Sequence, residues 1–596
     1  MVDQANQQSN PFDNNDMTAN MAEIAERSQR IVCEFLSRHP AEFGVSDPTN
    51  VGSTFMELTT KMMSDPTKLV QAQMNLWQDY MALWQHTSQR MMGEEPAPLA
   101  TPANDDRRFK HPEWDDNHLF NFVKQTYLLT ARWLQTTVSD VDGLDDKTAK
   151  KAEFYTRQFV DAMAPSNFVL TNPEVLQATV ASGGENLVRG LRNLLEDIED
   201  GDGQLRIRMT DPDAFTLGEN IAVTPGKVVY QNDLIQLLQY EPTTKQAYKR
   251  PLMIIPPWIN KYYILDLRPK NSFIKWAVAR GYTVFVLSWV NPDTKLAAKT
   301  FEDYLHEGPL AALDAIEQAT GSKDVNAIGY CLGGTLLACT LAYMAAKGDD
   351  RIKAATYFAS MVDFAEPGDL GVFIDEEQLA SLDERMDEKG YLDGKAMADT
   401  FSMMRSNDLV WSFVINNYML GKDPFPFDLL HWNSDSTRMP AAMHRFYLRK
   451  MYMENAMVKP GGITLDGIDI DLRKIETPSY VLSAHDDHIA PWTSTYAATQ
   501  LYSGPVRFVL AASGHIAGVI NPPDAKKYSH WTGKDQPASP ETWLEDAEEV
   551  AGSWWGDWHK WNARHAGKKA AARTPGDGNL TVIEDAPGSY ANQPAE

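Results

Sequence analysis

The chain has 596 residues, and its 55 Lys and Arg against 81 Asp and Glu give a formal net charge of −26. This length exceeds what one ordinary hydrophobic core can fill, so two domains are expected. The acidic excess argues against a nucleic-acid-binding protein, because such proteins neutralise phosphates with lysine and arginine.

The cysteines and the apolar runs indicate where the protein works. Only Cys33, Cys331 and Cys339 occur, which is too few for a disulfide scaffold and is typical of a reducing compartment. The chain does not begin with a basic and apolar leader, and no apolar run approaches membrane-spanning length. The sequence therefore predicts a cytoplasmic protein.

The first third of the chain predicts helices. Residues 1–17 are rich in Gln, Asn and Asp and are expected to be disordered. A helical domain is expected over residues 18–201, and a break rich in Gly and Asp sets its end. Apolar residues recur at helical spacing within residues 119–133, 151–163 and 186–198.

One predicted helix of this domain carries an apolar stripe with an alternating four- and three-residue spacing. Packing against another helix is the commoner interpretation of such a stripe. The alternative is contact with a partner or an apolar surface, because Met and Trp suit adaptable apolar contacts. The stripe consists of Val70, Met74, Trp77, Met81 and Trp84.

Residues 202–573 alternate strands and helices, which predicts a mostly parallel sheet with helices on both faces, as in α/β folds. Residues 362–473 interrupt the alternation, are too long for a loop and predict a cap. The tail from 574 to 596 is rich in Pro, Gly and Ala and is expected to be disordered. The predicted strands include residues 252–255, 283–287, 325–330 and 354–358, with a helix over 272–280. A tryptophan cluster near the end is interpreted as structural and comprises Trp554, Trp555, Trp558 and Trp561.

The pentapeptide Gly329-Tyr330-Cys331-Leu332-Gly333 lies between a predicted strand and a predicted helix. Strand, sharp turn and helix form the context of a nucleophile elbow, with cysteine here in place of serine. The alternative is that Cys331 is a small buried hydrophobic residue, as most free cysteines are. The flanking elements favour the elbow.

An acid and a histidine follow in the order that this fold requires. Asp486 and Asp487 follow an apolar strand pattern over residues 479–484, and His515 follows the next one, over residues 506–510. Asp487 is favoured as the partner of His515, because Asp486 suits the turn itself. The sequence thus predicts a Cys-His-Asp triad in an α/β-hydrolase fold.

Longer motifs surround these residues, at Pro256–Leu267, Gly329–Gly334, His431–Thr437, Asp487–Trp492 and Ser513–Val519. Together, from about residue 18 to about residue 565, the chain resembles the class I polyhydroxyalkanoate synthases. The resemblance implies polymerisation of (R)-3-hydroxyacyl-CoA, of short chain length such as 3-hydroxybutyryl-CoA, into a polyester with release of coenzyme A. It also implies that Cys331 is the nucleophile, His515 the general base and Asp487 the catalytic aspartate.

Further site residues are expected around the triad. The elbow places the backbone N–H of Leu332 where an oxyanion forms, and the loop after the first core strand makes Ile259 the second donor. The resemblance places Trp432 at the acyl pocket, with an ordinary core tryptophan as an equal alternative, and places His488 beside it. No metal or separate cofactor is expected, since coenzyme A is part of the substrate. Its phosphates require local basic residues despite the acidic chain.

The resemblance also implies a homodimer at the surface of a growing polyester granule, with granule-associated proteins as partners. Two other functions stay open at this point. One is a cysteine hydrolase of the dienelactone hydrolase or thioesterase type, which would release free acid. The other is a non-catalytic granule-coat protein, which the N-terminal helices alone suggest.

Overall fold

The computed structural model describes residues 51–103, 106–201, 203 and 205–594. The disordered start predicted for residues 1–17 lies outside these residues, as does Cys33. The chain divides into a helical unit, Met1–Asp211 with Phe401–Phe425, and a sheet unit, Pro212–Thr400 with Pro426–Glu596. The boundary predicted at residue 201 therefore lies too early, and Phe401–Phe425 does not belong with the rest of the expected cap.

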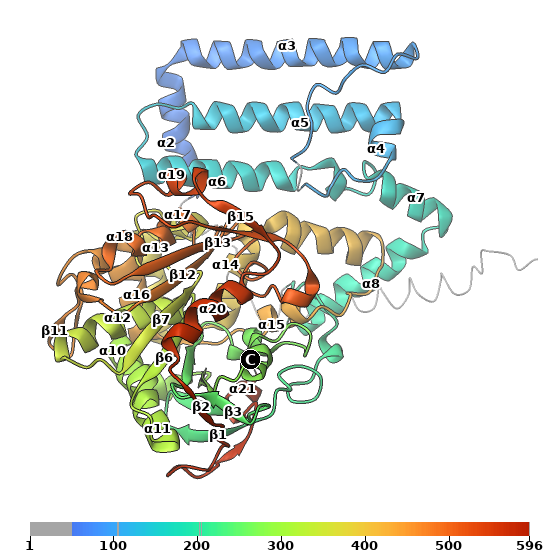
Figure 1. Ribbon diagram of the computed structural model, residues 1–596. Coiled ribbons are helices and arrows are strands. Elements are labelled where there is room, and N and C mark those ends of the chain that lie inside the picture. Colours follow the sequence, from blue (N-terminus) through green and yellow to red (C-terminus); the bar gives the residue numbers. More distant parts are fainter. Residues whose placement is uncertain (1–50, 104–105, 202, 204, 595–596) are drawn as a thin grey trace, which may run out of the picture. The chain divides into compact units, whose positions relative to one another are not determined.

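The helical unit contains long helices that lie side by side. Figure 1 shows α3, α5 and α6 running alongside one another, with α2 across one end. The side chain of Asp65 caps α3 by accepting a hydrogen bond from the N–H of Lys68 at 3.2 Å, and Pro66 occupies the first turn, as the sequence predicts. The helices are α2 (Val51–Ser64), α3 (Pro66–Met91), α4 (Glu113–Asp116), α5 (His118–Ser139), α6 (Asp146–Ala162), α7 (Pro173–Ala181) and α8 (Glu185–Asp200).

The apolar stripe on α3 faces solvent. Trp77 is 63% exposed and Trp84 is 66% exposed, and Val70, Met74 and Met81 are exposed as well. The buried residues of this helix are instead Leu76, Leu83 and His86. Interpretation of the stripe as a helix-packing seam is therefore wrong.

Residues 401–425 join the helical unit because they pack on α8. The side-chain amide of Asn186 donates to the carbonyl of Met419 at 2.7 Å, and the hydroxyl of Tyr418 donates to Asp197 at 2.5 Å. A Cβ atom on Gly190 would lie 1.8 Å from the carbonyl oxygen of Tyr418, so only glycine allows this approach. These contacts are long-range in sequence, which explains why local patterns placed the segment elsewhere.

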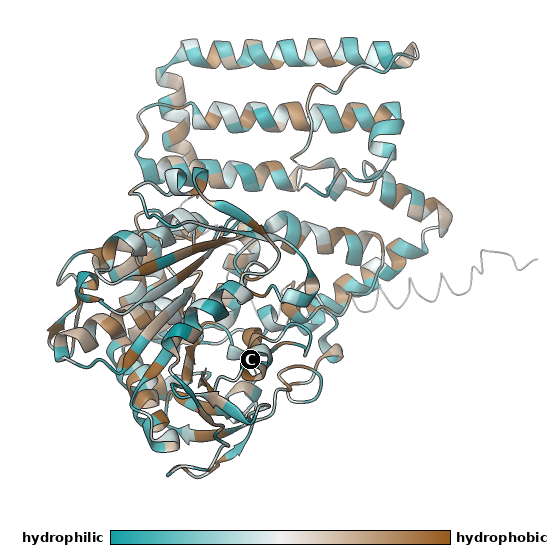
Figure 2. Ribbon diagram, viewed as in Figure 1, coloured by the Kyte–Doolittle hydropathy of each residue, from teal (hydrophilic) through white to brown (hydrophobic). Residues whose placement is uncertain are grey.

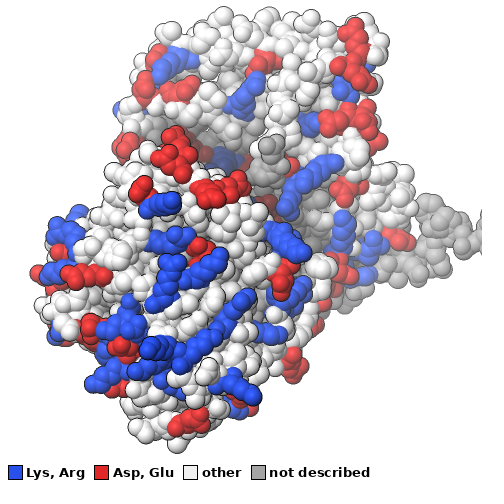
Figure 3. Space-filling model, in the orientation of Figure 1, with Lys and Arg blue, Asp and Glu red and all other residues white. Residues whose placement is uncertain are grey.

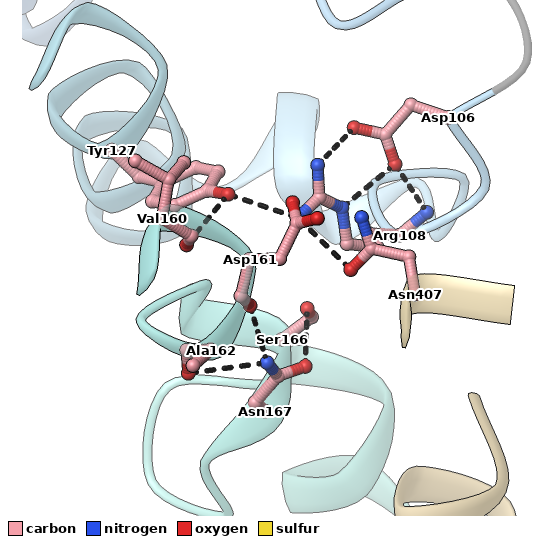
Figure 4. A network of polar contacts seen from close by, with 9 residues as sticks. All are labelled: Asp106, Arg108, Tyr127, Val160, Asp161, Ala162, Ser166, Asn167 and Asn407. Atoms are coloured by element: carbon pink, nitrogen blue, oxygen red, sulfur yellow. Dashed lines mark hydrogen bonds and ion pairs between the residues drawn. The ribbon is translucent and has the colours of Figure 1, made fainter. Parts of the chain in front are cut away.

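A buried ionic network holds the helical unit together around Arg108 (Figure 4). Its guanidinium donates to Asp106 at 2.9 and 3.0 Å, to Asp161 at 3.1 Å and to the hydroxyl of Tyr127 at 2.9 Å. Burial works to lower the pKa of Arg108, but the two carboxylates raise it above its ordinary value. Burial also raises the pKa of Tyr127 to about 12.

The sheet unit is built on a mixed sheet of eleven strands within the described residues. Six neighbouring strands, from β13 to β5, run parallel, and antiparallel strands extend both edges. The predicted strands of residues 252–255 and 325–330 match the observed β4 and β6. In spatial order the strands are β15 (Glu548–Ala551), β14 (Ser529–Thr532), β13 (Val506–Ala511), β12 (Ser479–Ala484), β7 (Ile352–Phe358), β6 (Val325–Tyr330), β4 (Leu252–Ile255), β5 (Val284–Trp289), β2 (Ile235–Tyr240), β1 (Gly226–Gln231) and β17 (Glu584–Asp585).

Shorter strands pair outside this sheet, as β3 (Gln246–Tyr248) with β16 (Lys569–Ala571), β8 (Tyr391–Leu392) with β9 (Met439–Pro440), and β10 (Thr464–Leu465) with β11 (Ile468–Asp469). Helices connect and cover the strands, and the expected interruption between β7 and β12 consists of helices, turns and the short strands β8 to β11. The helices are α9 (Phe273–Ala279), α10 (Phe301–Leu305), α11 (Ala311–Thr320), α12 (Leu332–Lys347), α13 (Glu376–Lys389), α14 (Gly394–Met404), α15 (Asp428–Ser434), α16 (Ala441–Tyr447), α17 (Trp492–Tyr496), α18 (Ala498–Leu501), α19 (Pro540–Glu545), α20 (Trp555–His565) and α21 (Ser589–Asn592).

The core of the sheet unit lies between the central strands and α9 with α20. Figure 2 shows hydrophobic residues concentrated along the central strands. Trp554, Trp555 and Trp558 are buried there, with the ring of Trp555 5.1 Å from that of Phe273. Their structural interpretation is confirmed.

The C-terminal tail is ordered, contrary to the prediction for residues 574–596, through its last described residue, Pro594. Strand β17 pairs with β1, and Ala591 is buried in the core. The buried side chain of Gln236 donates to the hydroxyl of Ser589 at 2.9 Å. Composition favoured disorder, but long-range pairing overrides it. Among the described residues, no helix has the length and apolarity to cross a bilayer.

We predict that Arg108→Met lowers the free energy of unfolding of the helical unit by about 3–5 kcal/mol, because it leaves two buried carboxylates without their cation. Chemical denaturation followed by circular dichroism measures this change. The matched control is Arg107→Met, since Arg107 is exposed. Equal unfolding midpoints for both variants would show that the network contributes nothing.

Candidate active site

Cys331 occupies a strained turn between β6 and α12. Its φ is 51° and its ψ −119°, a backbone conformation that side-chain-bearing residues rarely adopt. The N–H of Cys331 donates to the carbonyl of Phe358 at 2.8 Å, and its carbonyl accepts from the N–H of Gly334 at 2.9 Å. The surrounding hydrogen bonds thus hold the strained residue in place, as expected at a functional turn.

The glycines around Cys331 leave room for close contacts with backbone and with the side chain of Ser360. A Cβ atom on Gly329 would lie 2.4 Å from the Cα of Gly334, and one on Gly334 would lie 2.0 Å from the hydroxyl of Ser360. A Cβ atom on Gly333 would lie 2.0 Å from the carbonyl oxygen of Ile255. The start of α12 therefore packs directly against the end of β4, the strand that leads into the loop of Ile259.

Asp487 and His515 meet beyond the carboxyl ends of β12 and β13. The Nδ1 atom of His515 lies 2.6 Å from Oδ2 of Asp487, and the two side chains are 9% and 0% exposed. The other carboxylate oxygen accepts the N–H groups of Ile489 and Ala490, each at 2.9 Å. The carboxylate is buried, and three hydrogen bonds stabilise its charge.

The surroundings of His515 raise the pKa of its imidazole. Burial by itself lowers the pKa of His515, but the charge of Asp487, the Cys331 side chain and the hydrogen bonds with both raise the pKa well above its ordinary value. The structure thus brings Cys331, His515 and Asp487 together. A hydrogen-bonded imidazole between a thiol and a carboxylate can exchange a proton with the sulfur.

Three buried aromatic residues contact His515 and the loop that follows it. The ring of Tyr330 stacks on the imidazole of His515 with centroids 5.8 Å apart, and its hydroxyl donates to the His515 carbonyl at 3.2 Å. The indole N–H groups of Trp554 and Trp555 donate to the carbonyls of Gly518 and Val519 at 2.9 and 3.0 Å. The buried tryptophans therefore position the loop that follows His515.

The residues next to Asp487 have other partners. Asp486 is exposed, and its carboxylate lies 2.7 Å from Nδ1 of His485. The backbone carbonyl of His488 accepts from the N–H of Asp369 at 3.4 Å, and its side chain is half-buried. The geometry thus distinguishes Asp487 from Asp486 as the partner of His515.

The two residues expected at the oxyanion lie on adjoining elements. Leu332 is the first residue of α12, where backbone N–H groups have no acceptor within the helix. Ile259 is buried, and its carbonyl accepts from the N–H of Thr437 at 2.9 Å. The hydroxyl of Thr437 also donates to the carbonyl of Trp258. The loop after β4 is thus fastened to the segment around Thr437.

Trp432 is a core residue in this structure. It is buried in α15, within the hydrophobic core, and its indole N–H donates to the carbonyl of Lys261 at 2.7 Å. Of the two interpretations that the sequence left open, the geometry favours the structural one.

Aromatic residues that the sequence did not single out lie near Cys331. Tyr447 packs edge-on against Trp258 with ring centroids 5.8 Å apart, and Tyr452 lies 4.9 Å from the ring of Phe364. Burial raises the pKa of both tyrosines, and the charge of Cys331 contributes to each shift. The aromatic density of the expected cap was the available signal, but it did not identify these residues.

One cluster within the described residues has the side chains of a metal site. Glu302, His306 and Asp466 place ligand-type atoms within 4.8 Å of one another. The ammonium of Lys347 lies 3.8 Å from Asp466, whose carboxylate also accepts the hydroxyl of Tyr343 at 2.9 Å. Lys347 and Tyr343 thus already pair with the carboxylate of Asp466. The cluster does not include Cys331, Asp487 or His515.

Basic side chains gather on the face of the sheet unit that carries α20 (Figure 3). A cavity of about 550 Å³ on the sheet unit is lined by residues that include Trp276, Arg280, Lys526, His559 and Lys560. The lining contains none of Cys331, Asp487 and His515, so this cavity is distinct from the site around Cys331.

Comparison with known proteins gives concordant matches along the chain. A model described as the N-terminus of poly-beta-hydroxybutyrate polymerase (PhaC) matches residues 105–277, and an alpha/beta hydrolase fold model matches residues 264–522. The chain is 49% identical to the poly(3-hydroxyalkanoate) polymerase subunit PhaC of Rhizobium etli, over 92% of this chain and 87% of that protein. It is 50% identical to the poly(3-hydroxyalkanoate) polymerase of Methylorubrum extorquens, over 93% and 91%. For the PhaC subunit of Cupriavidus necator the identity is 42%, over 89% of each chain.

We predict that Asp487→Asn slows alkylation of Cys331 by iodoacetamide at neutral pH by about tenfold or more. The Asp487 charge raises the pKa of His515, so its removal makes the imidazole lose its second proton at lower pH. The imidazolium that favours a neighbouring thiolate is then absent at neutral pH. Mass spectrometry of the Cys331 peptide measures the rate, and Asp486→Asn is the matched control. Equal slowing in both variants, or none in Asp487→Asn, would contradict the assignment.

Proposed function

The chain belongs to the poly(3-hydroxyalkanoate) polymerase family, a family of acyltransferase-type enzymes, and from that premise we propose that it polymerises (R)-3-hydroxyacyl-CoA through an acyl-cysteine at Cys331. The single observation that carries the proposal is the buried pair of Asp487 and His515, joined at 2.6 Å, beside the strained Cys331. This arrangement has the nucleophile, base and orienting acid of covalent acyl transfer. The match of residues 105–277 to the polymerase N-terminus model, which covers part of the helical unit, supports a synthase over a small cysteine hydrolase.

In the proposed first step, His515 takes the thiol proton of Cys331 and the sulfur attacks the substrate thioester. The bond between the acyl carbon and the coenzyme A sulfur breaks, and coenzyme A leaves as a thiol with the proton from His515. One thioester replaces another, so the step is nearly balanced in energy. The N–H groups of Leu332 and Ile259 are the proposed donors to the oxyanion of the tetrahedral intermediate.

In the second step, His515 takes the proton of a 3-hydroxyl group, whose oxygen attacks the acyl-cysteine. An ester forms and the Cys331 thiol is regenerated with that proton. Water would divert the same intermediate to free acid, so the site must exclude it. The aromatic residues Tyr447 and Tyr452 are suited to this role, because the charge of Cys331 acts on both and their rings pack against Trp258 and Phe364.

The proposed substrate is the short-chain 3-hydroxybutyryl-CoA, on the resemblance to class I enzymes. Comparing release of coenzyme A from 3-hydroxybutyryl-CoA and from 3-hydroxydecanoyl-CoA tests this choice. Polymer together with free thiol supports the synthase, whereas free 3-hydroxy acid indicates a hydrolase.

We predict that Cys331→Ala abolishes release of coenzyme A from the substrate and leaves the fold intact. The physical reason is that the strained turn presents no other nucleophile. Thiol release is followed with a chromogenic disulfide. The matched control is Cys339→Ala, since Cys339 is fully buried in α12 and burial raises its pKa to about 12. Activity that survives the first substitution and is lost with the second would overturn the elbow assignment.

The exposed stripe on α3 supports a proposed contact with the polyester product. The product of such an enzyme is insoluble in water, and an exposed apolar stripe of Met and Trp suits an apolar surface. We therefore place the protein in the cytoplasm at polyhydroxyalkanoate granules, as a homodimer by its resemblance, with residues of the helical unit making granule contact and no catalytic contribution.

We predict that Trp77→Gln with Trp84→Gln weakens sedimentation with polymer granules and lengthens the lag before polymerisation, with thiol chemistry at Cys331 preserved. Both indoles are more than half exposed, so their loss does not open a cavity. Granule co-sedimentation and a time course of thiol release are the measurements. The matched control changes the exposed polar residues Gln78 and Gln85 of the same helix to Ala. Unchanged sedimentation and lag in the tryptophan variant would rule out the stripe as a granule contact.

A further inference from the structure

The last described residues form a strap across the sheet unit, Glu584–Pro594, which we call the C-terminal strap. Its strand β17 pairs with β1, and the hydroxyl of Tyr590 donates to the carbonyl of Asn232 at 2.6 Å. The N–H of Tyr590 donates to the buried side chain of Gln236 at 3.0 Å. These bonds fix the path of the strap up to its final residues.

The end of the strap contacts the loop that follows β4. The ammonium of Lys261 donates to the backbone carbonyl of Gln593. Lys261 follows Ile259 by two positions, and Ile259 is the proposed second donor to the oxyanion. The strap therefore reaches the catalytic loop through a main-chain atom, which no side-chain pattern in the sequence reveals.

Burial makes this contact necessary for Lys261. Its side chain is only 4% exposed, and its ammonium lies 2.7 Å from the carboxylate of Asp435. A buried ammonium is costly unless its protons have acceptors. Asp435 also accepts the hydroxyl of Tyr263 at 2.8 Å, so the carbonyl of Gln593 is an acceptor for Lys261 that the carboxylate does not replace.

The strap also contacts the loop that follows β5. The side-chain oxygen of Gln593 accepts a hydrogen bond from the backbone N–H of Asn291 at 3.3 Å. The side-chain amide of Asn291 donates to the carbonyl of Pro594 at 2.8 Å. The side-chain oxygen of Asn291 in turn accepts the N–H of Arg438 at 2.9 Å. Gln593 thus contacts both the loop after β4 and the loop after β5. Both loops also form hydrogen bonds with the segment around Trp432 and Thr437.

We propose that the C-terminal strap positions the loop after β4, and that Gln593 is a positioning residue for the oxyanion donor Ile259. The inference rests on the proposed function for the identity of that donor. Gln593 acts through Lys261 and not on the substrate. Its removal leaves the Asp487–His515 pair in place, because that pair is held by Ile489, Ala490 and the buried tryptophans.

The test compares a chain that ends at Asn592 with a chain that ends at Pro594, which keeps every contact described above. Loss of one oxyanion donor costs about 10²–10³ in kcat, and displacement of the donor loop is expected to lower kcat for thiol release by about tenfold or more. We expect KM to change little. The rate of Cys331 alkylation by iodoacetamide should also be unchanged, because alkylation forms no oxyanion.

A second variant keeps the proposal testable if the shortened chain does not fold. Lys261→Met removes the hydrogen bond between Lys261 and the Gln593 carbonyl by changing its donor. If both changes act through this bond, kcat of the double variant should be no lower than kcat of the more impaired single variant. An unchanged kcat in the chain ending at Asn592, an equal loss of alkylation rate, or additive losses would each overturn the proposal. Thiol release that persists in Cys331→Ala would instead refute the proposed function, so the two failures are distinguishable.

Discussion

The buried contact between Asp487 and His515 is the interaction on which the rest of the site depends. A carboxylate without solvent is stable only when hydrogen bonds replace its hydration, and here the imidazole and two backbone N–H groups do so. The same charge keeps the pKa of His515 high although burial opposes it. The pair thus fixes the orientation of the ring and holds a proton on it, as the proposed chemistry at Cys331 requires.

Much of the sheet unit serves to hold these groups at one edge. The parallel strands end there, the glycines of the elbow let α12 approach β4, and Trp554 and Trp555 bind the loop beyond His515. The loop after β4, which carries the proposed oxyanion donor Ile259, is held by contacts with Thr437 and, through Lys261, with the strap. Stabilisation of an oxyanion requires hydrogen-bond donors that are already in place before the reaction. The contacts of the loop after β4 keep the backbone of this loop in one position.

The turn at Cys331, the meeting of Asp487 with His515 and the central strands could be predicted from the sequence because their signals are local. A glycine-flanked cysteine between an apolar run and a helix, and an acid and a histidine after two successive strands, follow from chain order alone. The solvent-facing side of α3 could not be predicted, since a stripe of Val, Met and Trp has the same spacing whether it is buried or exposed. The exposure of the stripe depends on α5 packing against the opposite side of α3, where Trp133 donates to the carbonyl of Ala72 at 2.9 Å.

The ordered C-terminal tail could not be predicted, because Gln236 and Lys261, which bind it, lie hundreds of residues away in sequence. Residues 401–425 were misplaced for the same reason.

The most direct test of the account is to identify the acylated residue. The protein would be mixed briefly with 3-hydroxybutyryl-CoA, quenched in acid, digested and examined by mass spectrometry. The account predicts a 3-hydroxybutyryl adduct, or a short oligomer of it, on the peptide that contains Cys331. An adduct confined to Cys33 or Cys339, or turnover with no covalent adduct at any cysteine, would contradict it.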